Sequence, residues 1–420
     1  MRLQFHHWPS MAAWLVLLGC GAPPAQTTAL DASSTDADLV TASDAATSSD
    51  DAGRGDAGVD PSAELFETAA LPRFDLQLSE EAIASLRTDP FTYVIGRFEF
   101  EEEVMEEVNV RLKGRTSFQS IDEKPSFKVR FDRPHRGQRF RGLRGLVWNN
   151  CAKDPSCTAE RLAFRVFRAA GVPAPRCGNA RVYVNGEYYG VYADVEPEDE
   201  AFLSRWWADA SGNLYESEFG DLDASSAQAF ELETNKAVND RRDLRELSAA
   251  IDQVTPETVM GLDSLLNMDE LLRMWAVEAA VGQRDGYAFL LWGDDVPGNF
   301  RLYHDPLSSQ FQLIPWSLDR AMKPPHLSPF TSYSRIPFAC LAGASCRQAF
   351  RTHVAAVADL WESLPLLAEA NAIRDQIRPW VELDSRRSHD MAAFDSAVAG
   401  VLSVVTSRPA ELRADLQANP

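Results

Sequence analysis

The chain has 420 residues, of which 45% are hydrophobic and 10% aromatic, so it carries enough apolar material for a sizeable core. Its formal net charge of -21 excludes a protein that binds duplex DNA through a basic face, and we expect no nucleic-acid partner. No apolar run reaches the roughly 18 residues that a membrane-spanning helix needs, which excludes a multi-pass membrane protein.

The first twenty residues have the pattern of a secretory signal. Arg2 precedes a short apolar stretch at 11–18, and Gly19 and Cys20 follow it. The ending Leu-Leu-Gly-Cys at 17–20 resembles the bacterial lipobox, in which the cysteine becomes the lipidated first residue of the mature protein. The alternative is an ordinary signal peptide with an incidental cysteine. We therefore expect a lipoprotein signal over residues 1–20, lipidation of Cys20, and an exported protein anchored to the membrane at the cell envelope.

Residues 21–63 are predicted to be a disordered acidic tether. The segment is rich in Ala, Ser, Thr, Asp and Gly, and it holds eight aspartates and one arginine, a net charge of -7. Such a composition cannot bury enough apolar surface to offset the entropy of ordering. We expect this segment to hold a folded domain, residues 64–420, away from the membrane.

The cysteines of the folded part form two closely spaced pairs. Cys151 and Cys157 flank five residues, and so do Cys340 and Cys346. In an exported protein each pair could close a small disulfide loop, although cross-pairing between the two loops stays open. Cys177 is left over and is expected to be a buried thiol. Zinc is not expected, since the sequence has no CxxC motif and no histidine at ligand spacing.

The first half of the folded part is predicted to be rich in strands. Alternating apolar and polar residues predict strands at 71–78, 92–101, 104–113 and 125–131. Helical spacing predicts helices at 79–88, starting at Ser79, and at 158–170, ending before Gly171. Residues 180–196 predict a hairpin, because Asn185-Gly186 lies between two alternating runs.

The second half is predicted to be mainly helical. Helices are expected at about 198–208, 240–252, 268–283, 346–362, 365–378 and 386–414. Two hydrophobic strands are expected at 300–305 and 311–318, and the proline-rich stretch 322–337 as an irregular loop. The pattern predicts an α+β fold with two lobes, a strand-rich N-lobe at about 64–197 and a helical C-lobe at about 198–420.

Eight segments, in this order, resemble the CotH kinase family, named for spore coat protein H: RLKGRTSF (111–118), KPSFKVRF (124–131), ERLAFRVFRAAGVPAPRC (160–177), RVYVNGEYYGVYADVE (181–196), GNLYE (212–216), GQRDGYAF (282–289), NFRLYHDP (299–306) and FQLIPWSLD (311–319). Each segment alone is a weak signal, but their common order over residues 71–330 is a strong one. The resemblance implies an atypical protein-kinase-like fold that uses ATP and a divalent metal, Mg²⁺ or Mn²⁺. It also implies phosphorylation of serine-rich protein substrates.

Phosphoryl transfer needs a cradle and a cation for the phosphates, and this sequence has neither a Walker A motif nor a GxGxxG loop. A turn at 114–117, with Lys113 before it and Arg115 and Ser117 within it, could cover the phosphates. The alternative is an ordinary surface turn.

The resemblance places the phosphate-binding lysine at Lys124, which we favour over Lys128 on the same predicted strand. Solvated lysines are the alternative for both. Glu160 could pair with this lysine, although a first-turn acid favoured by the helix dipole is the simpler reading. By family position Glu196 should lie near the adenine as a nucleotide contact.

The resemblance makes Asp285 the catalytic aspartate and assigns Asn299 and Asp319 to the metal. The family commonly has Trp-Asp-x-Asp where this chain reads Trp-Ser-Leu-Asp, so Ser317 stands in place of one carboxylate. Loss of that ligand could abolish transfer.

Three functions are therefore compared. The first is an exported, membrane-tethered kinase that modifies Ser or Thr of envelope or secreted proteins. The second is a catalytically inactive CotH-like module that binds a partner or assembles material at the envelope, which Ser317 and the scarcity of ATP outside the cytoplasm favour. The third, a metal-dependent hydrolase or transferase on another fold, rests only on scattered carboxylates.

Overall fold

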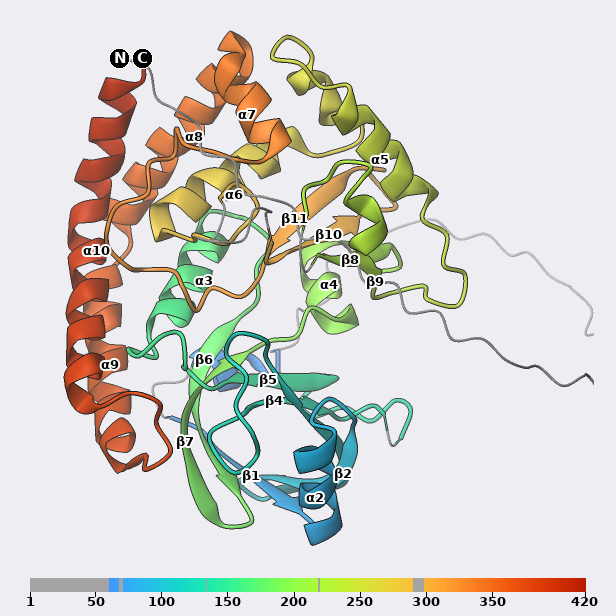
Figure 1. Cartoon of the computed structure of the whole chain (residues 1–420), viewed down its shortest axis with the longest axis vertical. Helices are drawn as coiled ribbons and strands as arrows, with labels where there is room; N and C mark the ends of the chain where they lie inside the picture. The colour runs from blue at the N-terminus through green and yellow to red at the C-terminus, as the bar shows by residue number, and fades with distance from the viewer. Residues whose placement is uncertain (1–59, 68–70, 134, 218–219, 290–297) are drawn as a thin grey trace, which may run out of the picture. The chain divides into compact units, whose positions relative to one another are not determined.

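The computed structural model describes residues 60–67, 71–133, 135–217, 220–289 and 298–420 (Figure 1). The predicted signal, the lipidation at Cys20 and the tether up to residue 59 lie outside these residues. The chain separates into two units, residues 1–57 and 58–420, and the account below concerns the second. No described helix is both long and apolar enough to cross a membrane.

The N-terminal part is a closed barrel of seven strands in the order β1-β2-β3-β4-β5-β7-β6. Neighbouring strands are antiparallel except β1 and β6, which pair in parallel and close the barrel. The strands are β1 (Arg73–Leu78), β2 (Val94–Phe100), β3 (Glu103–Lys113), β4 (Ser126–Arg130), β5 (Gly145–Asn149), β6 (Cys177–Val184) and β7 (Glu187–Val195). Two short helices accompany them, α1 (Ala63–Glu67) and α2 (Glu80–Thr88), and the Ser79 side chain caps α2 as expected.

The predicted hairpin is confirmed by β6 and β7. Asn185 and Gly186 both have positive φ, 51° and 79°, as a two-residue turn that follows the twist of the strands requires. The strand β5 was not predicted, because four of its five residues are buried and its sequence therefore does not alternate. Aromatic rings fill the barrel, with Phe74 stacked on Trp148 at 5.3 Å between ring centroids.

The C-terminal part combines a four-stranded sheet, in the order β11-β10-β8-β9, with helices (Figure 1). The sheet strands are β8 (Asn213–Ser217), β9 (Glu231–Leu232), β10 (Phe300–His304) and β11 (Phe311–Pro315). The helices are α3 (Ala159–Ala169), which comes from the chain between β5 and β6, α4 (Glu200–Trp206), α5 (Arg242–Asp252), α6 (Met268–Val281), α7 (Arg335–Ala342), α8 (Ala344–Ser363), α9 (Leu366–Leu383) and α10 (Met391–Ala418). Two 3-10 turns lie at Ala227–Ala229 and Val259–Ser264.

These elements confirm the α+β prediction of a strand-rich first part and a helical second part. Three local predictions were wrong in extent. The helices expected at 365–378 and 386–414 are α9 and α10, Leu366–Leu383 and Met391–Ala418, and the irregular loop expected at 322–337 ends at Ser334, just before α7. Pro337 was predicted as part of the loop, but it lies in the first turn of α7. A proline there costs no backbone hydrogen bond and is compatible with a helix. The structure joins Cys151 to Cys157, and Cys340 of α7 to Cys346 of α8, and leaves Cys177 as a buried thiol.

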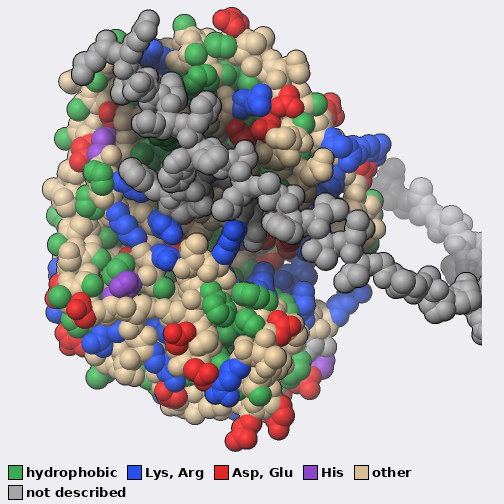
Figure 2. Space-filling view, viewed as in Figure 1, with side chains coloured by type: hydrophobic (Ala, Val, Ile, Leu, Met, Phe, Trp, Pro, Cys, Tyr) green, Lys and Arg blue, Asp and Glu red, His purple; other side chains and the backbone are tan. Residues whose placement is uncertain are grey.

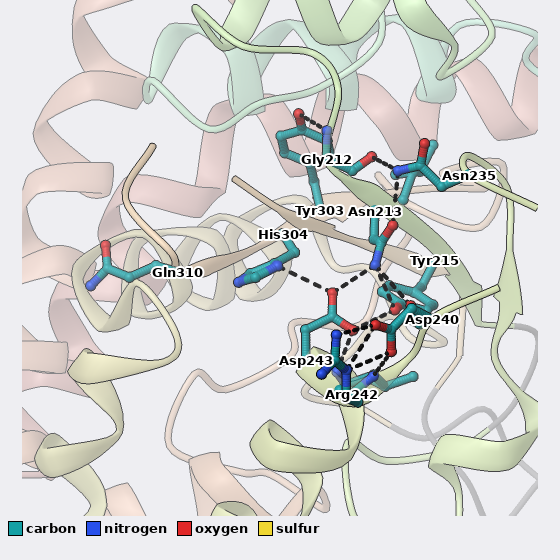
Figure 3. Close-up of polar contacts among 12 residues, drawn as sticks. Gly212, Asn213, Tyr215, Asn235, Asp240, Arg242, Asp243, Tyr303, His304 and Gln310 are labelled. Atoms are coloured by element: carbon teal, nitrogen blue, oxygen red, sulfur yellow. Dashed lines mark hydrogen bonds and ion pairs between the residues drawn. The ribbon is translucent and has the colours of Figure 1, made fainter. Parts of the chain in front are cut away.

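A polar cluster attaches α5 to the sheet (Figure 3). The Asp243 carboxylate accepts hydrogen bonds from the Tyr215 hydroxyl at 2.6 Å and from Asn213 Nδ2 at 2.9 Å. It also pairs with His304 Nδ1 at 3.1 Å, and the His304 ring stacks on Phe311 at 4.6 Å. The cluster fixes the sheet strands that carry one wall of the site described next.

Candidate functional site

A cleft lies between the barrel and the four-stranded sheet. It consists of two cavities of about 680 and 500 Å³ that share four lining residues, Arg111, Lys113, Glu216 and Trp316. The linker between β7 and α4, which joins the barrel to the helical part, contributes residues 197–200 to the larger cavity. Figure 2 shows basic side chains gathered across the middle of the face viewed there.

Lys113, at the end of β3, lines the cleft and is connected by hydrogen bonds to helix α3. Its Nζ donates to Asn149 Oδ1 at 2.6 Å, and Asn149 Nδ2 donates to both oxygens of Glu160 at 3.0 and 2.9 Å. Glu160 is buried in the first turn of α3. The pKa of Glu160 is raised to about 8, chiefly by burial and also by the neighbouring Asp319. The hydrogen bond from Asn149 and the charge of Lys113 oppose this shift.

Asp285 and Asp319 form the acidic wall of the smaller cavity. Burial raises the pKa of Asp285 to about 7, Asp319 adds to the shift, and Arg320, at 3.4 Å from Asp285 Oδ2, opposes it. Burial also raises the pKa of Asp319, against the nearby Lys113 and Lys323. Asp319 raises the pKa of Asp285 because two negative charges lie close together. A cation bound beside them would be stabilised by both.

The chain around Asp285 is held by a buried carboxyl of α6. Glu278 accepts hydrogen bonds from the backbone amides of Tyr287 at 2.9 Å and Ala288 at 3.0 Å. A Cβ added to Gly286 would overlap Glu278 Oε1, so only glycine fits between them. Burial raises the pKa of Glu278 to about 7, while these two amide bonds oppose the shift.

Asn299 and Ser317 lie on facing segments beside Asp285. Asn299 Nδ2 donates to the Asp285 carbonyl at 3.1 Å, and the Trp316 amide donates to the Asn299 carbonyl at 3.1 Å. Both Asn299 and Ser317 have positive φ, 52° and 55°. Asn299, Trp316 and Ser317 line the smaller cavity together with Asp285 and Asp319. The three residues predicted for catalysis and metal binding, Asp285, Asn299 and Asp319, are thus brought together.

The donor set fits a hard divalent cation that takes much of its shell from elsewhere. Among the described residues no group of three or more His, Cys, Asp or Glu is arranged to hold a metal ion. Asp319 and Asn299 offer oxygen ligands, and Asp285 Oδ1 is buried without a hydrogen-bond partner in the described part of the chain. Mg²⁺ is commonly bound by only one or two carboxylates together with substrate phosphates and water, and this set meets that requirement.

The turn after β3 covers the smaller cavity. Gly114, at φ 112°, turns the chain, and Arg115 and Ser117 line the cavity beside it. Lys128 lines the larger cavity, and burial lowers its pKa to about 8, with Arg301 and Arg111 adding to the shift.

Two residues predicted to contact nucleotide lie outside both cavities. Lys124 is buried and pairs with Asp384, at the end of α9, at 2.6 Å. Glu196 is buried in ion pairs with Arg176 and Arg205. Glu198, two residues further along the linker, lines the larger cavity instead. The lysines that line the cleft are thus Lys113 and Lys128. The glutamate that lines it from the linker is Glu198.

Several lining residues were not predicted from the sequence. Arg301 bridges the linker and the sheet, since it pairs with Glu198 at 3.2 Å and Glu216 at 3.1 Å. Its guanidinium lies 5.0 Å from the centre of the Trp316 ring, which also faces Lys113 at 5.5 Å. Arg111 precedes Lys113 by two residues on β3, so strand periodicity could have placed both on one face.

A barrel, a helical part, and a cleft in which a strand lysine is linked to a helix glutamate opposite two aspartates define a kinase-like protein. Comparison with known families makes the assignment specific. The family described as CotH kinase protein matches residues 110–412, and the chain belongs to this family.

The chain is also similar to individual known proteins. The chain is 24% identical over 326 residues to inner spore coat protein H of Bacillus subtilis (strain 168), covering 69% of this chain and 83% of that protein. The Helicobacter pylori proinflammatory kinase CtkA matches at 11% identity and a TM-score of 0.28, covering 67% of this chain and 92% of the other. HipA, HipB and their operator DNA, a toxin–antitoxin complex of Shewanella oneidensis MR-1, match at 11% and 0.34, with coverages of 80% and 82%. Scores this low carry no argument about the site.

Proposed function

We propose that this chain is an atypical protein kinase that transfers a phosphoryl group from ATP to Ser or Thr of protein substrates. One observation carries the proposal: Lys113, which is connected through Asn149 to Glu160, lines the same cavity as Asp285 and Asp319. This is the combination of phosphate cation, helix anchor, base and metal ligand that phosphoryl transfer requires.

Each residue has a distinct role in this proposal. Lys113 holds the phosphates, with the turn that contains Arg115 and Ser117 above them. Asp285, whose pKa of about 7 suits a base near neutral pH, accepts the proton of the attacking hydroxyl. Asp319 and Asn299 would hold Mg²⁺ or Mn²⁺, which supplies charge stabilisation at the transferring phosphoryl oxygens.

The larger cavity is the proposed site of the nucleoside. It lies beside the linker at 197–200, and Val147, Leu203 and Trp316 give it apolar surface. Lys128 and Glu198 lie within it as polar contacts for base or ribose.

The test is transfer of labelled phosphate from ATP to the chain itself and to a serine-rich acceptor protein. Lys113→Met and Asp285→Asn should each lower the rate by about 100-fold or more, since both groups act on the reacting atoms. Arg245→Met, at an exposed arginine of α5 that lines neither cavity of the cleft, is the control and should transfer normally. Equal rates in all four proteins would contradict the proposal.

A non-catalytic CotH-like module is the second candidate, and Ser317 is the observation that favours it. This hydroxyl lines the cavity where the family commonly has a carboxylate, which weakens the acidic set available to a metal. Nucleotide binding by the wild-type chain without transfer to any acceptor would support a role in binding or assembly at the envelope.

We further propose that the chain is exported and anchored by lipid at Cys20, so that its substrate or partner is an envelope or secreted protein. The lipobox-like ending at 17–20 and the acidic tether after it support this proposal. Cys20→Ser should move the expressed protein from the detergent-soluble membrane fraction to the aqueous fraction. An unchanged distribution would exclude lipidation at this residue.

A further inference from the structure

A third cavity, of about 510 Å³, lies between α3 and α9 and shares no lining residue with the cleft. Arg161, Arg165 and Arg168 of α3 line it. Their spacing of four and three residues puts them on one face of the helix. Glu369 and Gln376 line it from α9.

The guanidinium of Arg161 is held by neutral groups. Its NH1 donates to Asn179 Oδ1 at 3.3 Å and to Gln376 Oε1 at 3.2 Å, and it forms no ion pair within the residues that the structure describes. Burial lowers the pKa of Arg161, although Glu369 opposes the shift. A cation in such surroundings is costly unless an anion compensates it.

The charges around the cavity do not balance. Arg165 meets Glu369 at 3.7 Å, and Arg168 donates to the Pro175 carbonyl at 2.6 Å. Among the described residues that line the cavity, Arg165 shares the one carboxylate, Glu369, and Arg161 has none. The lining thiol of Cys177 adds no charge, because burial raises its pKa well above the ordinary value. A phosphate group, with a charge of about −1.5 to −2 at pH 7, would compensate Arg161.

We propose that this cavity binds a phosphate group and that its occupancy fixes α3. Guanidinium groups bind phosphate oxygens in pairs, and three of them converge here from one helix. Glu160 and Arg161 are consecutive, so their side chains leave α3 about 100° apart, one toward the cleft and one toward the cavity. An anion that draws α3 toward α9 therefore stabilises the position in which Glu160 reaches Asn149 and, through it, Lys113. This site is separate from the proposed catalytic cleft and does not require transfer activity.

The test is a phosphorus NMR titration of the full chain at constant ionic strength, first with inorganic phosphate and then with O-phosphoserine. Arg161→Gln and Arg165→Gln should each weaken binding by about tenfold or more. Arg245→Gln, at an exposed arginine of α5, is the matched control. Lys113→Met, which removes the proposed phosphate cation of the cleft, separates anion bound there from anion bound in this cavity and should leave binding in this cavity unchanged. Tighter binding of O-phosphoserine would identify a phosphoester as the ligand, and equal binding the free anion.

Two results would overturn the site: equal affinity in Arg161→Gln and the wild type, or loss of binding in Lys113→Met alone, which would put the anion in the cleft. If Arg161→Gln does not fold, Arg165→Gln, at a more exposed position, decides the question. Hydrogen exchange tests the coupling to α3. Phosphate should slow exchange over 159–169 in the wild type but not in Arg161→Gln, and unchanged exchange in both would overturn the coupling.

Discussion

Lys113 and Lys124 are separated by eleven residues but occupy different environments. Lys124 and Asp384 form an ion pair whose side chains are 4% and 1% exposed. The close approach of Asp384 to β7 depends on Gly190, where a Cβ would overlap the carboxylate. Lys124 therefore ties the end of α9 to the barrel, whereas Lys113 faces the cleft.

Lys124→Met is expected to destabilise the fold by about 3–5 kcal/mol, because it leaves the buried Asp384 carboxylate without its partner. Urea unfolding followed by circular dichroism measures this loss. Lys113→Met should unfold within about 1 kcal/mol of the wild type, since its loss removes a cation from a part-buried site that has other cations nearby. A stable Lys124→Met variant that no longer binds nucleotide would reverse these two roles.

Ser317 stands where the family resemblance of the sequence leads us to expect a carboxylate. Ser317→Asp should strengthen metal-dependent nucleotide binding by about tenfold, as an added charged ligand contributes roughly 1.5 kcal/mol. Aspartate tolerates the positive φ of this position. Ser317→Ala is the control and should bind as the wild type does. If Ser317→Asp shows no gain in calorimetry, the residue does not face the metal.

Some residues of the site were predicted from the sequence and others were not, and the physical reasons differ between them. Asp285, Asn299 and Asp319 were predicted through family motifs, and the structure brings them into one cavity. The structural position of Lys124, which was favoured over Lys128, could not be predicted, because a strand pattern does not show that Asp384, 260 residues away, pairs with it. The ion pairs that bury Glu196 could not be predicted for the same reason, since its partners Arg176 and Arg205 come from other elements.

At the scale of elements, the carboxyl of Glu278 holds the turn that leads from α6 to Asp285 and beyond. Gly286→Ala should displace Glu278 from the amides of Tyr287 and Ala288 and so lower phosphoryl transfer, at a stability cost of about 1–3 kcal/mol. Gly261→Ala, where an added Cβ meets nothing within 4 Å, is the matched control. Measured kcat and thermal midpoint in both variants test this prediction, and normal transfer by Gly286→Ala would contradict it.

The disulfide between α7 and α8 closes a short loop at the start of the C-terminal helices. Replacing both Cys340 and Cys346 by Ala should lower the free energy of unfolding by roughly 2 kcal/mol, the loop-entropy value for a separation of six residues. Unfolding of this variant and of the wild type with and without reductant separates this bond from Cys151–Cys157, which reductant also breaks. A loss below about 0.5 kcal/mol would show that packing of α7 on α8 suffices without the bond.

The attachment of α5 to the sheet is expected to depend on pH (Figure 3). The hydrogen bond to Asp243 raises the pKa of His304 above 6.5, although burial opposes it, so the stabilisation is complete below pH 6.5 and is lost as pH rises through the folded pKa. For Asp243, burial raises the pKa but the bonds from His304, Tyr215 and Asn213 outweigh it and lower the pKa to about 2. Its contribution is therefore present above about pH 4 and lost as pH falls toward 2.

The pair should thus contribute most between about pH 4 and 6.5. His304→Gln should reduce stability by about 0.5–1 kcal/mol in this window, the range for partly exposed pairs, and by less at higher pH. Thermal midpoints of both proteins across the pH range measure the difference. A difference that does not change with pH would show that stacking on Phe311, rather than the ion pair, is what His304 contributes.

At the scale of the whole molecule, the barrel and the helical part each supply half of the cleft. Lys113 and Lys128 come from β3 and β4, whereas Asp285 and Asp319 follow α6 and β11. The periodicity of the sequence predicted that both parts exist, and the α+β arrangement is confirmed. Their meeting in one cleft could not be predicted from periodicity, because it depends on long-range pairs such as Arg301 with Glu198. Only the order of the family motifs predicted that the two parts form one site.

We expect this cleft to bind ATP with a divalent metal despite Ser317. Calorimetric titration of the chain with ATP, without metal and with Mg²⁺ or Mn²⁺, tests this beside Asp319→Ala and the exposed control Glu246→Ala of α5. Binding should require metal, persist in Glu246→Ala and be lost in Asp319→Ala. An absence of binding with either metal would contradict it and leave a kinase-like fold whose cleft serves another ligand.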